Sequence, residues 1–129
     1  MSKIALSPAF VDQRGVITDL LNDVSISSVG LVTSKAGVVR GNKYHLREDK
    51  YIYIMRGKLE WVSRAHGSEE IETVTYQTGD FFLVPALTEH AMRFIEDSEM
   101  IQLTTESRAG SGYEDDTCRL ETPLIAPSI

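Results

Sequence analysis

The chain has 129 residues, 42% of them hydrophobic and 25% charged, a composition typical of one globular domain. Nineteen acidic residues outnumber 13 lysines and arginines, and the net charge of −6 argues against a nucleic-acid partner. The single cysteine, Cys118, cannot form an internal disulfide, so we expect a reducing, cytoplasmic location and leave the role of Cys118 open. No apolar run is long enough to cross a bilayer, so no membrane partner is expected.

The first half of the chain predicts short strands separated by turns. A turn at 12–15 precedes a strand over 16–21, and a β-branched run at 26–33 predicts the next strand. The segments 51–55 and 59–62 are both rich in β-forming residues, and they are separated by a glycine turn typical of a hairpin.

The second half continues the pattern without helical periodicity. A polar hairpin loop leads to a strand over 71–76, and further strands are predicted over 81–84, 90–94 and 100–103. Many short strands at even spacing predict an all-β sandwich or a closed barrel. We expect a single domain over 1–129 with its core barrel at about 16–105. The polar, glycine-rich start of 107–129 predicts a flexible loop followed by a C-terminal extension.

Two frames of glycine and proline surround the histidines. The first runs from Arg40 through His45 to Gly57, and the second runs from Gly79 through Pro85 to His90. Both frames resemble the two signature motifs of the cupin superfamily. The resemblance implies a cupin-type double-stranded β-helix, a jelly-roll barrel of two antiparallel sheets. In metal-binding cupins the matching positions carry His, His, Glu and His, whereas this chain has Lys43, His45, Lys50 and His90.

Lysine at two of the four ligand positions argues against a metal. Zinc, iron and manganese sites use neutral imidazoles and carboxylates, whereas a lysine ammonium repels a metal cation. We therefore expect no cofactor. The alternative is a divalent metal held by His45, His90 and a third ligand that the sequence does not identify.

The lysines favour an anion instead. If the first motif is in register with the cupins that it resembles, strand alternation places Lys43 and His45 on the same inward face. A cation in an apolar cavity attracts a carboxylate, phosphate or enolate. For Lys50 a place in the solvent at the barrel mouth is equally open, because the charged residues at 47–49 are typical of an exposed turn.

The two motif histidines suit acid–base chemistry, because imidazole titrates near neutral pH. The alternative is that both are core histidines bonded to the barrel wall. Met92 and Phe94 alternate with His90 and are expected to line the cavity, while Trp61 offers a stacking surface.

Three segments resemble a narrower group, the nucleotide-sugar epimerases and ketoisomerases that act on dTDP-4-keto-6-deoxyhexoses. They are 10–15 with the following Asp19, the pair Arg40-Gly41, and 113–117. In the 3,5-epimerases the residue two after the glycine is the base histidine, and in the 3,4-ketoisomerases the residue at His45 is also a histidine. This chain keeps the second histidine and replaces the first with Lys43.

The sequence therefore predicts a metal-independent isomerase, epimerase or lyase that transfers a proton on a small carbonyl-bearing substrate, anionic or linked to a nucleotide. His45 would move the proton, Lys43 would stabilise the enolate and His90 would complete the relay. The alternatives are a metal-dependent cupin enzyme that uses His45 and His90, and a non-catalytic small-ligand-binding cupin. A homodimer is expected. The substrate would contact Arg40, Lys50, Met92, Phe94 and Trp61.

Overall fold

Antiparallel strands dominate the computed structural model, which describes residues 3–127. The strands are β1 (Phe10–Asp12), β2 (Gly15–Ile17), β3 (Ser28–Ser34), β4 (Val39–His45), β5 (Lys50–Arg56), β6 (Lys58–Ala65), β7 (Glu72–Gln77), β8 (Phe81–Val84), β9 (Thr88–Phe94), β10 (Ser98–Thr104) and β11 (Thr117–Arg119). One short helix, α1 (Gly112–Asp116), precedes β11. Among the described residues, no helix is long and apolar enough to span a membrane.

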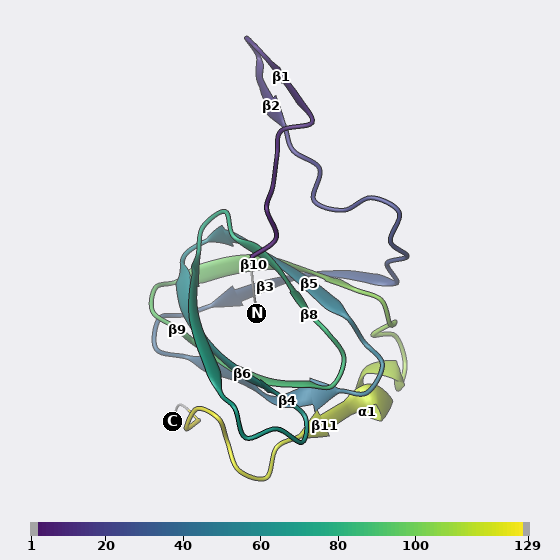
Figure 1. Cartoon of the computed structure of the whole chain (residues 1–129), viewed down its shortest axis with the longest axis vertical. Helices are drawn as coiled ribbons and strands as arrows, with labels where there is room; N and C mark the ends of the chain where they lie inside the picture. Colours follow the sequence, from purple (N-terminus) through teal and green to yellow (C-terminus); the bar gives the residue numbers. More distant parts are fainter. Residues whose placement is uncertain (1–2, 128–129) are drawn as a thin grey trace.

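Two sheets face each other and enclose the barrel (Figure 1). One has the strand order β3-β10-β5-β8 and the other the order β11-β4-β9-β6-β7, with antiparallel pairing throughout. The all-β jelly roll predicted from the motifs is confirmed, and the strand predicted over 81–84 coincides with β8.

Side-chain alternation along the strands builds the core. On β5 the buried Ile52 and Ile54 alternate with half-buried tyrosines, which is the pattern of a strand with one face inward. Burying each such side chain contributes about 1.5–3 kcal/mol. The turn to β6 needs Gly57, because its φ is 112° and an added Cβ would lie 2.1 Å from Ser98 Oγ. The core cluster consists of Ile52, Ile54, Leu59, Trp61, Tyr76, Phe82, Val84, Met92, Phe94 and Met100.

The N-terminal hairpin differs from the prediction. The strand expected over 16–21 is limited to β2, which pairs with β1 in a hairpin that projects away from the barrel (Figure 1). The strands of the two large sheets begin at Ser28 and not near residue 16. The intervening segment contains turn-forming polar residues, including Asp23 with φ 59°, which interrupt strand pairing.

The segment after β10 is more ordered than the flexible loop expected there. It contains α1 and β11, and β11 pairs with β4. The buried carboxylate of Asp116 accepts hydrogen bonds from the backbone N–H groups of Arg47 and Glu48, at 2.8 and 3.0 Å. These bonds hold α1 against the turn between β4 and β5. The division into one domain over 1–129 stays a prediction.

Candidate active site

A cavity of about 280 Å³ opens inside the barrel, between the two sheets. Four of its lining side chains are cationic, and none of the described residues that line it is acidic. A larger hollow of about 560 Å³ lies beside the β6–β7 hairpin, but it contains none of the predicted site residues. The lining of the inner cavity is Val32, Val39, Arg40, Gly41, Lys43, Lys50, His90, Met92, Met100, Gln102 and Arg108.

A bulge in β4 brings Arg40 and Lys43 to the same cavity. Arg40 pairs with Met92 and Lys43 pairs with His90, with a shift of register between them. In a regular strand two residues three apart point to opposite faces, so the extra residue is what aligns these two cations. Gly41 has φ 96° and Asn42 has φ 57°, and a Cβ on Gly41 would lie 2.9 Å from the carbonyl oxygen of His90.

Arg40 is fixed at the edge of the cavity by β3. Its Nε donates a hydrogen bond to Ser34 Oγ at 2.8 Å, and its Nη2 donates to the carbonyl oxygen of Thr33 at 3.1 Å. Neither partner is charged, so the guanidinium keeps its positive charge available to a ligand.

Lys50 is buried in the cavity, with only 4% of its surface exposed. The open alternative of an exposed lysine at the barrel mouth is wrong, because β5 begins at Lys50 and its pairing with Val84 and Thr104 turns the side chain inward. Burial, and then the charges of Lys43 and Arg108, lower the pKa of Lys50 to about 8, although a negative charge on Glu48 opposes them. Lys50 therefore has a neutral fraction at moderately alkaline pH.

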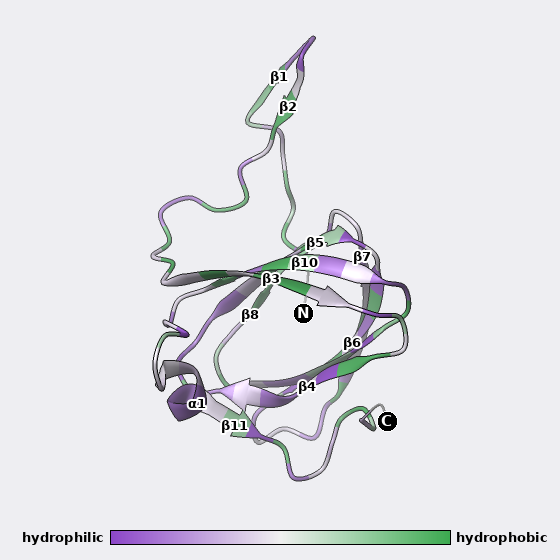
Figure 2. Cartoon of the chain, turned by 180° about the vertical axis from the view of Figure 1, so that it is seen from behind, coloured by the Kyte–Doolittle hydropathy of each residue, from purple (hydrophilic) through white to green (hydrophobic). Residues whose placement is uncertain are grey.

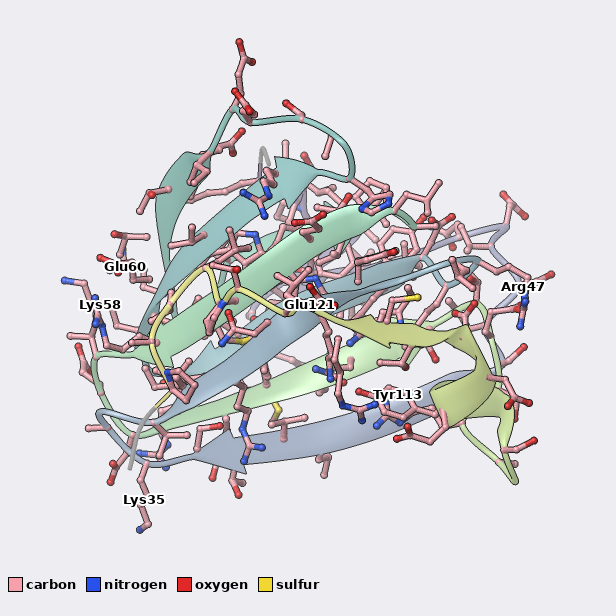
Figure 3. The ribbon with its side chains drawn as sticks, turned by 90° about the horizontal axis from the view of Figure 1, so that it is seen from below. Lys35, Arg47, Lys58, Glu60, Tyr113 and Glu121 are labelled. Atoms are coloured by element: carbon pink, nitrogen blue, oxygen red, sulfur yellow. The ribbon has the colours of Figure 1, made fainter. Side chains whose placement is uncertain are left out.

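Tyr113 on α1 connects two of the cavity cations. Lys43 Nζ donates a hydrogen bond to the Tyr113 hydroxyl, and the Arg108 guanidinium lies 4.0 Å from the ring centroid in a cation–π contact. Figure 3 shows Tyr113 extending from α1 toward the barrel. Sequence analysis noted Tyr113 only as part of a resemblance and missed Arg108. The only sequence feature that could have indicated a role for these two residues is that an arginine and a tyrosine occur close together within a polar segment.

His45 lies behind the cavity wall and does not line the cavity. It is 4% exposed, and its Nδ1 lies 3.3 Å from Thr117 Oγ1. Burial, followed by the positive charges of Lys50 and Lys43, lowers its pKa to about 4. The expectation that His45 titrates near neutral pH is not supported.

His90 lines the cavity and is fixed from two sides. Its Nδ1 donates a hydrogen bond to the carbonyl oxygen of Thr88 at 3.0 Å, and its ring stacks on Trp61. Burial and the charge of Lys50 lower its pKa to about 3, so the imidazole is neutral at physiological pH. With Nδ1 protonated, Nε2 carries the lone pair.

Glu48 is a buried carboxyl that sequence analysis assigned to an exposed turn. It is 3% exposed, and its Oε2 lies 3.1 Å from His45 Nε2 and 3.7 Å from Lys50 Nζ. Burial raises the pKa of Glu48. A run of three charged residues at 47–49 predicts an exposed turn, but only Arg47 in this run is highly exposed. Burial of Glu48 could not be predicted, because a turn has no side-chain periodicity that indicates which residue points inward.

Three residues expected to bind substrate separate into two groups. Met92 lines the cavity, as predicted. Trp61 and Phe94 are not among its lining residues and belong to the hydrophobic core. Their side chains pack behind the cavity wall, so they shape it without reaching a ligand.

The described residues do not fit a metal. In 3–127 no group of three or more His, Cys, Asp or Glu side chains has a metal-binding arrangement. The two imidazoles lie beside two lysines, and the nearby carboxyl of Glu48 does not complete the set of three or four ligands that transition-metal sites use. Absence of a cofactor stays a prediction that metal analysis can test.

The family comparison identifies one match over most of the chain. The model of the polysaccharide biosynthesis C-terminal domain matches residues 10–118. Comparison with curated protein sequences gives no significant match. Several solved structures share the fold, at identities that carry no information on activity.

Three of these structures illustrate the range. The capsular polysaccharide assembling protein CapF from Staphylococcus aureus is 21% identical with a TM-score of 0.67 over 92% of this chain, which spans only 35% of the CapF chain. The dTDP-4-dehydrorhamnose 3,5-epimerase from Sulfolobus tokodaii is 18% identical with a TM-score of 0.73, over 98% of this chain and 79% of that one. The sugar 3,4-ketoisomerase QdtA from Thermoanaerobacterium thermosaccharolyticum, in complex with TDP, is 16% identical with a TM-score of 0.75, over 93% and 88%.

The predicted likeness to the nucleotide-sugar epimerases and ketoisomerases is therefore confirmed at the level of the fold. Because the family match covers most of its length, this chain belongs to the polysaccharide biosynthesis C-terminal domain family.

Proposed function

We propose that this protein is a metal-independent sugar isomerase or epimerase that transfers a proton on an anionic, nucleotide-linked keto-sugar. The observation that carries the proposal is the convergence of Arg40, Lys43, Lys50 and Arg108 on one small cavity whose described lining has no acidic residue. Cations in a low-dielectric cavity gain most from an anionic ligand. Two proteins that share the fold support this substrate class. One is named as an epimerase of a dTDP-linked sugar, and the other is named as a sugar ketoisomerase and was solved in complex with TDP.

The cations divide into two positions. Arg40 and Arg108 are exposed residues at the opening, where they suit the phosphates of a nucleotide. Lys43 lies further along β4 and holds the Tyr113 hydroxyl, so an ammonium and a phenol face the same point. Both groups can donate to an oxyanion that develops on a substrate carbonyl.

Lys50 is the best placed group for proton transfer. It lines the cavity, and its pKa of about 8 leaves a neutral amine that can accept a proton. The neutral amine takes the proton from the carbon next to the carbonyl, and the electron pair moves to the carbonyl oxygen to form an enolate. Delivery of a proton to the other face, from a donor on that face, gives an epimer. Delivery of the proton to the former carbonyl carbon, with transfer of the proton of the neighbouring hydroxyl to the oxyanion, gives an isomer.

This assignment changes the expected role of His45. His45 was predicted to move the substrate proton, but it lies behind the cavity lining. His90 does reach the cavity, and its neutral imidazole offers Nε2 as a hydrogen-bond acceptor for a substrate hydroxyl.

Incubation of dTDP-linked 4-keto-6-deoxysugars in heavy water tests the proposal. The wild-type protein should place deuterium next to the carbonyl, as read by mass spectrometry and NMR, and Lys50→Met should abolish the exchange. Lys35→Met is the matched control, because Lys35 is exposed on a turn. If ligands bind but the wild-type protein catalyses no exchange, the protein is a binding cupin.

We also propose a homodimer. Phe10, Val11, Val16 and Ile17 on the projecting hairpin are each more than half exposed, and so are Val29 and Leu31 on the edge strand β3. Figure 2 shows this hydrophobic character on β1, β2 and β3. A two-stranded hairpin alone has little stability in water, so covering these side chains on a second copy is favourable.

A further inference from the structure

The hydroxyl of Thr117 determines which nitrogen of His45 carries a proton. Thr117 Oγ1 donates to the backbone carbonyl oxygen of Tyr113, because a carbonyl oxygen can only accept. A threonine hydroxyl has only one hydrogen. Toward His45 Nδ1, at 3.3 Å, the same oxygen can therefore only accept. His45 consequently has its proton on Nδ1.

The opposite nitrogen of His45 then faces Glu48 with its lone pair. His45 Nε2 and Glu48 Oε2 lie 3.1 Å apart, and neither atom has a well-aligned hydrogen bond to any described residue. Both side chains are at least 95% buried. Two bare acceptors at this distance would repel each other without water to screen them. A second proton must therefore lie between these two atoms.

The surroundings favour the carboxyl as the holder of this proton. Lys43 on β4, Lys50 on β5 and Arg108 after β10 all oppose a positive charge on His45, and only the Asp116 carboxylate favours one. The same three cations favour an ionised Glu48, but burial is the largest effect on both groups and favours the neutral form of each. His90 on β9 lies on the far side, with ring centroids 6.3 Å apart, and is neutral. An ion pair of imidazolium and carboxylate would also have to be desolvated.

We infer that Glu48 is a protonated carboxylic acid that donates its hydrogen to His45 Nε2, so that it lies beside Lys50 without being its counter-ion. The distance of 3.7 Å from Glu48 Oε2 to Lys50 Nζ is longer than a hydrogen bond and agrees with this. Burial shifts the pKa values in the same direction, since that of Glu48 is raised and that of His45 is lowered.

The consequence for the site rests on the proposed function. If Glu48 were ionised, it would be the counter-ion of Lys50, would raise the pKa of Lys50 and would keep the side chain charged. A neutral Glu48 favours the neutral amine of Lys50, which is the form that takes the proton in the proposed reaction. Glu48 is thus a positioning residue that acts through Lys50 and His45.

Infrared difference spectroscopy at pH 7 tests the inference without any substrate. The spectrum of the wild-type protein minus that of Glu48→Gln should show the carbonyl stretch of a protonated carboxylic acid. The control Glu99→Gln removes a half-exposed carboxylate that pairs with Arg56, and it should show only carboxylate bands. If the Glu48→Gln difference also shows only carboxylate bands, the inference is wrong.

Nitrogen NMR of the His45 ring provides a second, independent measurement. In the wild-type protein Nδ1 should carry the proton and Nε2 should accept one. Glu48→Gln should preserve this state, because its amide can donate to Nε2, whereas Glu48→Ala and Thr117→Val should not. A wild-type His45 with its proton on Nε2 would overturn the inference. If Glu48→Gln does not fold, the chemical shift of the Glu48 carboxyl carbon in the wild-type protein reports directly whether this group is protonated. Both measurements use no substrate, so their outcome does not depend on whether the protein catalyses the heavy-water exchange.

Discussion

His90 and Trp61 stack face to face, with ring centroids 5.0 Å apart and ring planes 5° apart. The indole supports the imidazole from the core side, and the carbonyl of Thr88 holds Nδ1. Trp61 thus acts on the cavity indirectly, by fixing the orientation of a ring that lines it.

The stack predicts different costs for two substitutions of Trp61. Trp61→Ala should lower the free energy of unfolding by about 3–5 kcal/mol, because it leaves a cavity in the core. Trp61→Phe should cost less, because it keeps a stacking ring and removes a buried indole Nε1 that has no hydrogen-bond partner among residues 3–127. Denaturant unfolding measures both, and equal costs would contradict the stacking role.

Acid should destabilise the fold through the two buried histidines. Their pKa values, about 4 and about 3 when folded, lie below the value of 6.5 expected when unfolded, so the unfolded chain binds more protons as pH falls below 6.5. Each histidine contributes a slope of about 1.4 kcal/mol per pH unit between its folded and unfolded values. Stability from this source is therefore present above pH 6.5 and lost on acidification.

Urea unfolding across pH 4.5–6.5 measures these slopes. His45→Gln and His90→Gln should each flatten the dependence by about one proton. Glu48→Gln should steepen it, because the raised pKa of Glu48 opposes the histidines. Lys35→Gln, at an exposed position on a turn, is the control. An unchanged slope in both histidine variants would refute the prediction.

Anions should raise the melting temperature of the protein. dTDP and inorganic phosphate should stabilise the fold, and neutral sugars should not, because four cations line the cavity. Lys43→Met and Arg108→Met should each weaken the shift, and Lys35→Met should leave it unchanged. A phosphate-dependent shift that survives in both cavity variants would place the anion elsewhere.

The purified protein should contain no stoichiometric transition metal. The described residues hold no three-ligand set, and Lys43 and Lys50 lie beside the two histidines. Elemental analysis provides the measurement. About one iron, zinc, nickel or manganese per chain, lost in His45→Ala, would disprove metal independence.

Introducing a charge on the edge strand should disrupt the proposed dimer. Leu31 is 75% exposed, so Leu31→Glu should leave the isolated fold intact while burying a charge in the interface. Light scattering should then give a mass of one chain for Leu31→Glu and of two chains for the wild-type protein. Ile71→Glu, at another exposed apolar position, is the control. A wild-type mass of one chain would end this proposal.

The strands and the barrel could be predicted from sequence, because β propensity and turn residues act locally. The β5–β6 hairpin is one case, since Gly57 marks a turn that no other residue can adopt without overlap. The motif spacing also placed Lys43 and His90 in one cavity. The projecting hairpin was not predictable, because its apolar side chains have the same pattern as a barrel strand.

The errors at the site came from long-range contacts. Glu48 is buried because Asp116, 68 residues later, holds the backbone of its turn. His45 is removed from the cavity for a related reason, since α1 and β11 cover it from the C-terminal side. No periodicity within 45–50 contains that information.

The bulge at Asn42 has a consequence for the comparison of homologous sequences. An alignment that treats β4 as a regular strand will move every position on one side of the bulge to the opposite face of the sheet. Substitutions at Arg40 would then be assigned to the outer surface, although this residue lines the cavity. The Asn42 side chain also bonds the backbone of Leu124 and Ile125, so a relative that lacks the bulge should differ in its C-terminal tail as well. A relative that lacks one residue at this point of β4 should therefore have a different set of cavity cations, whereas a relative that keeps the bulge should share the set described for this chain.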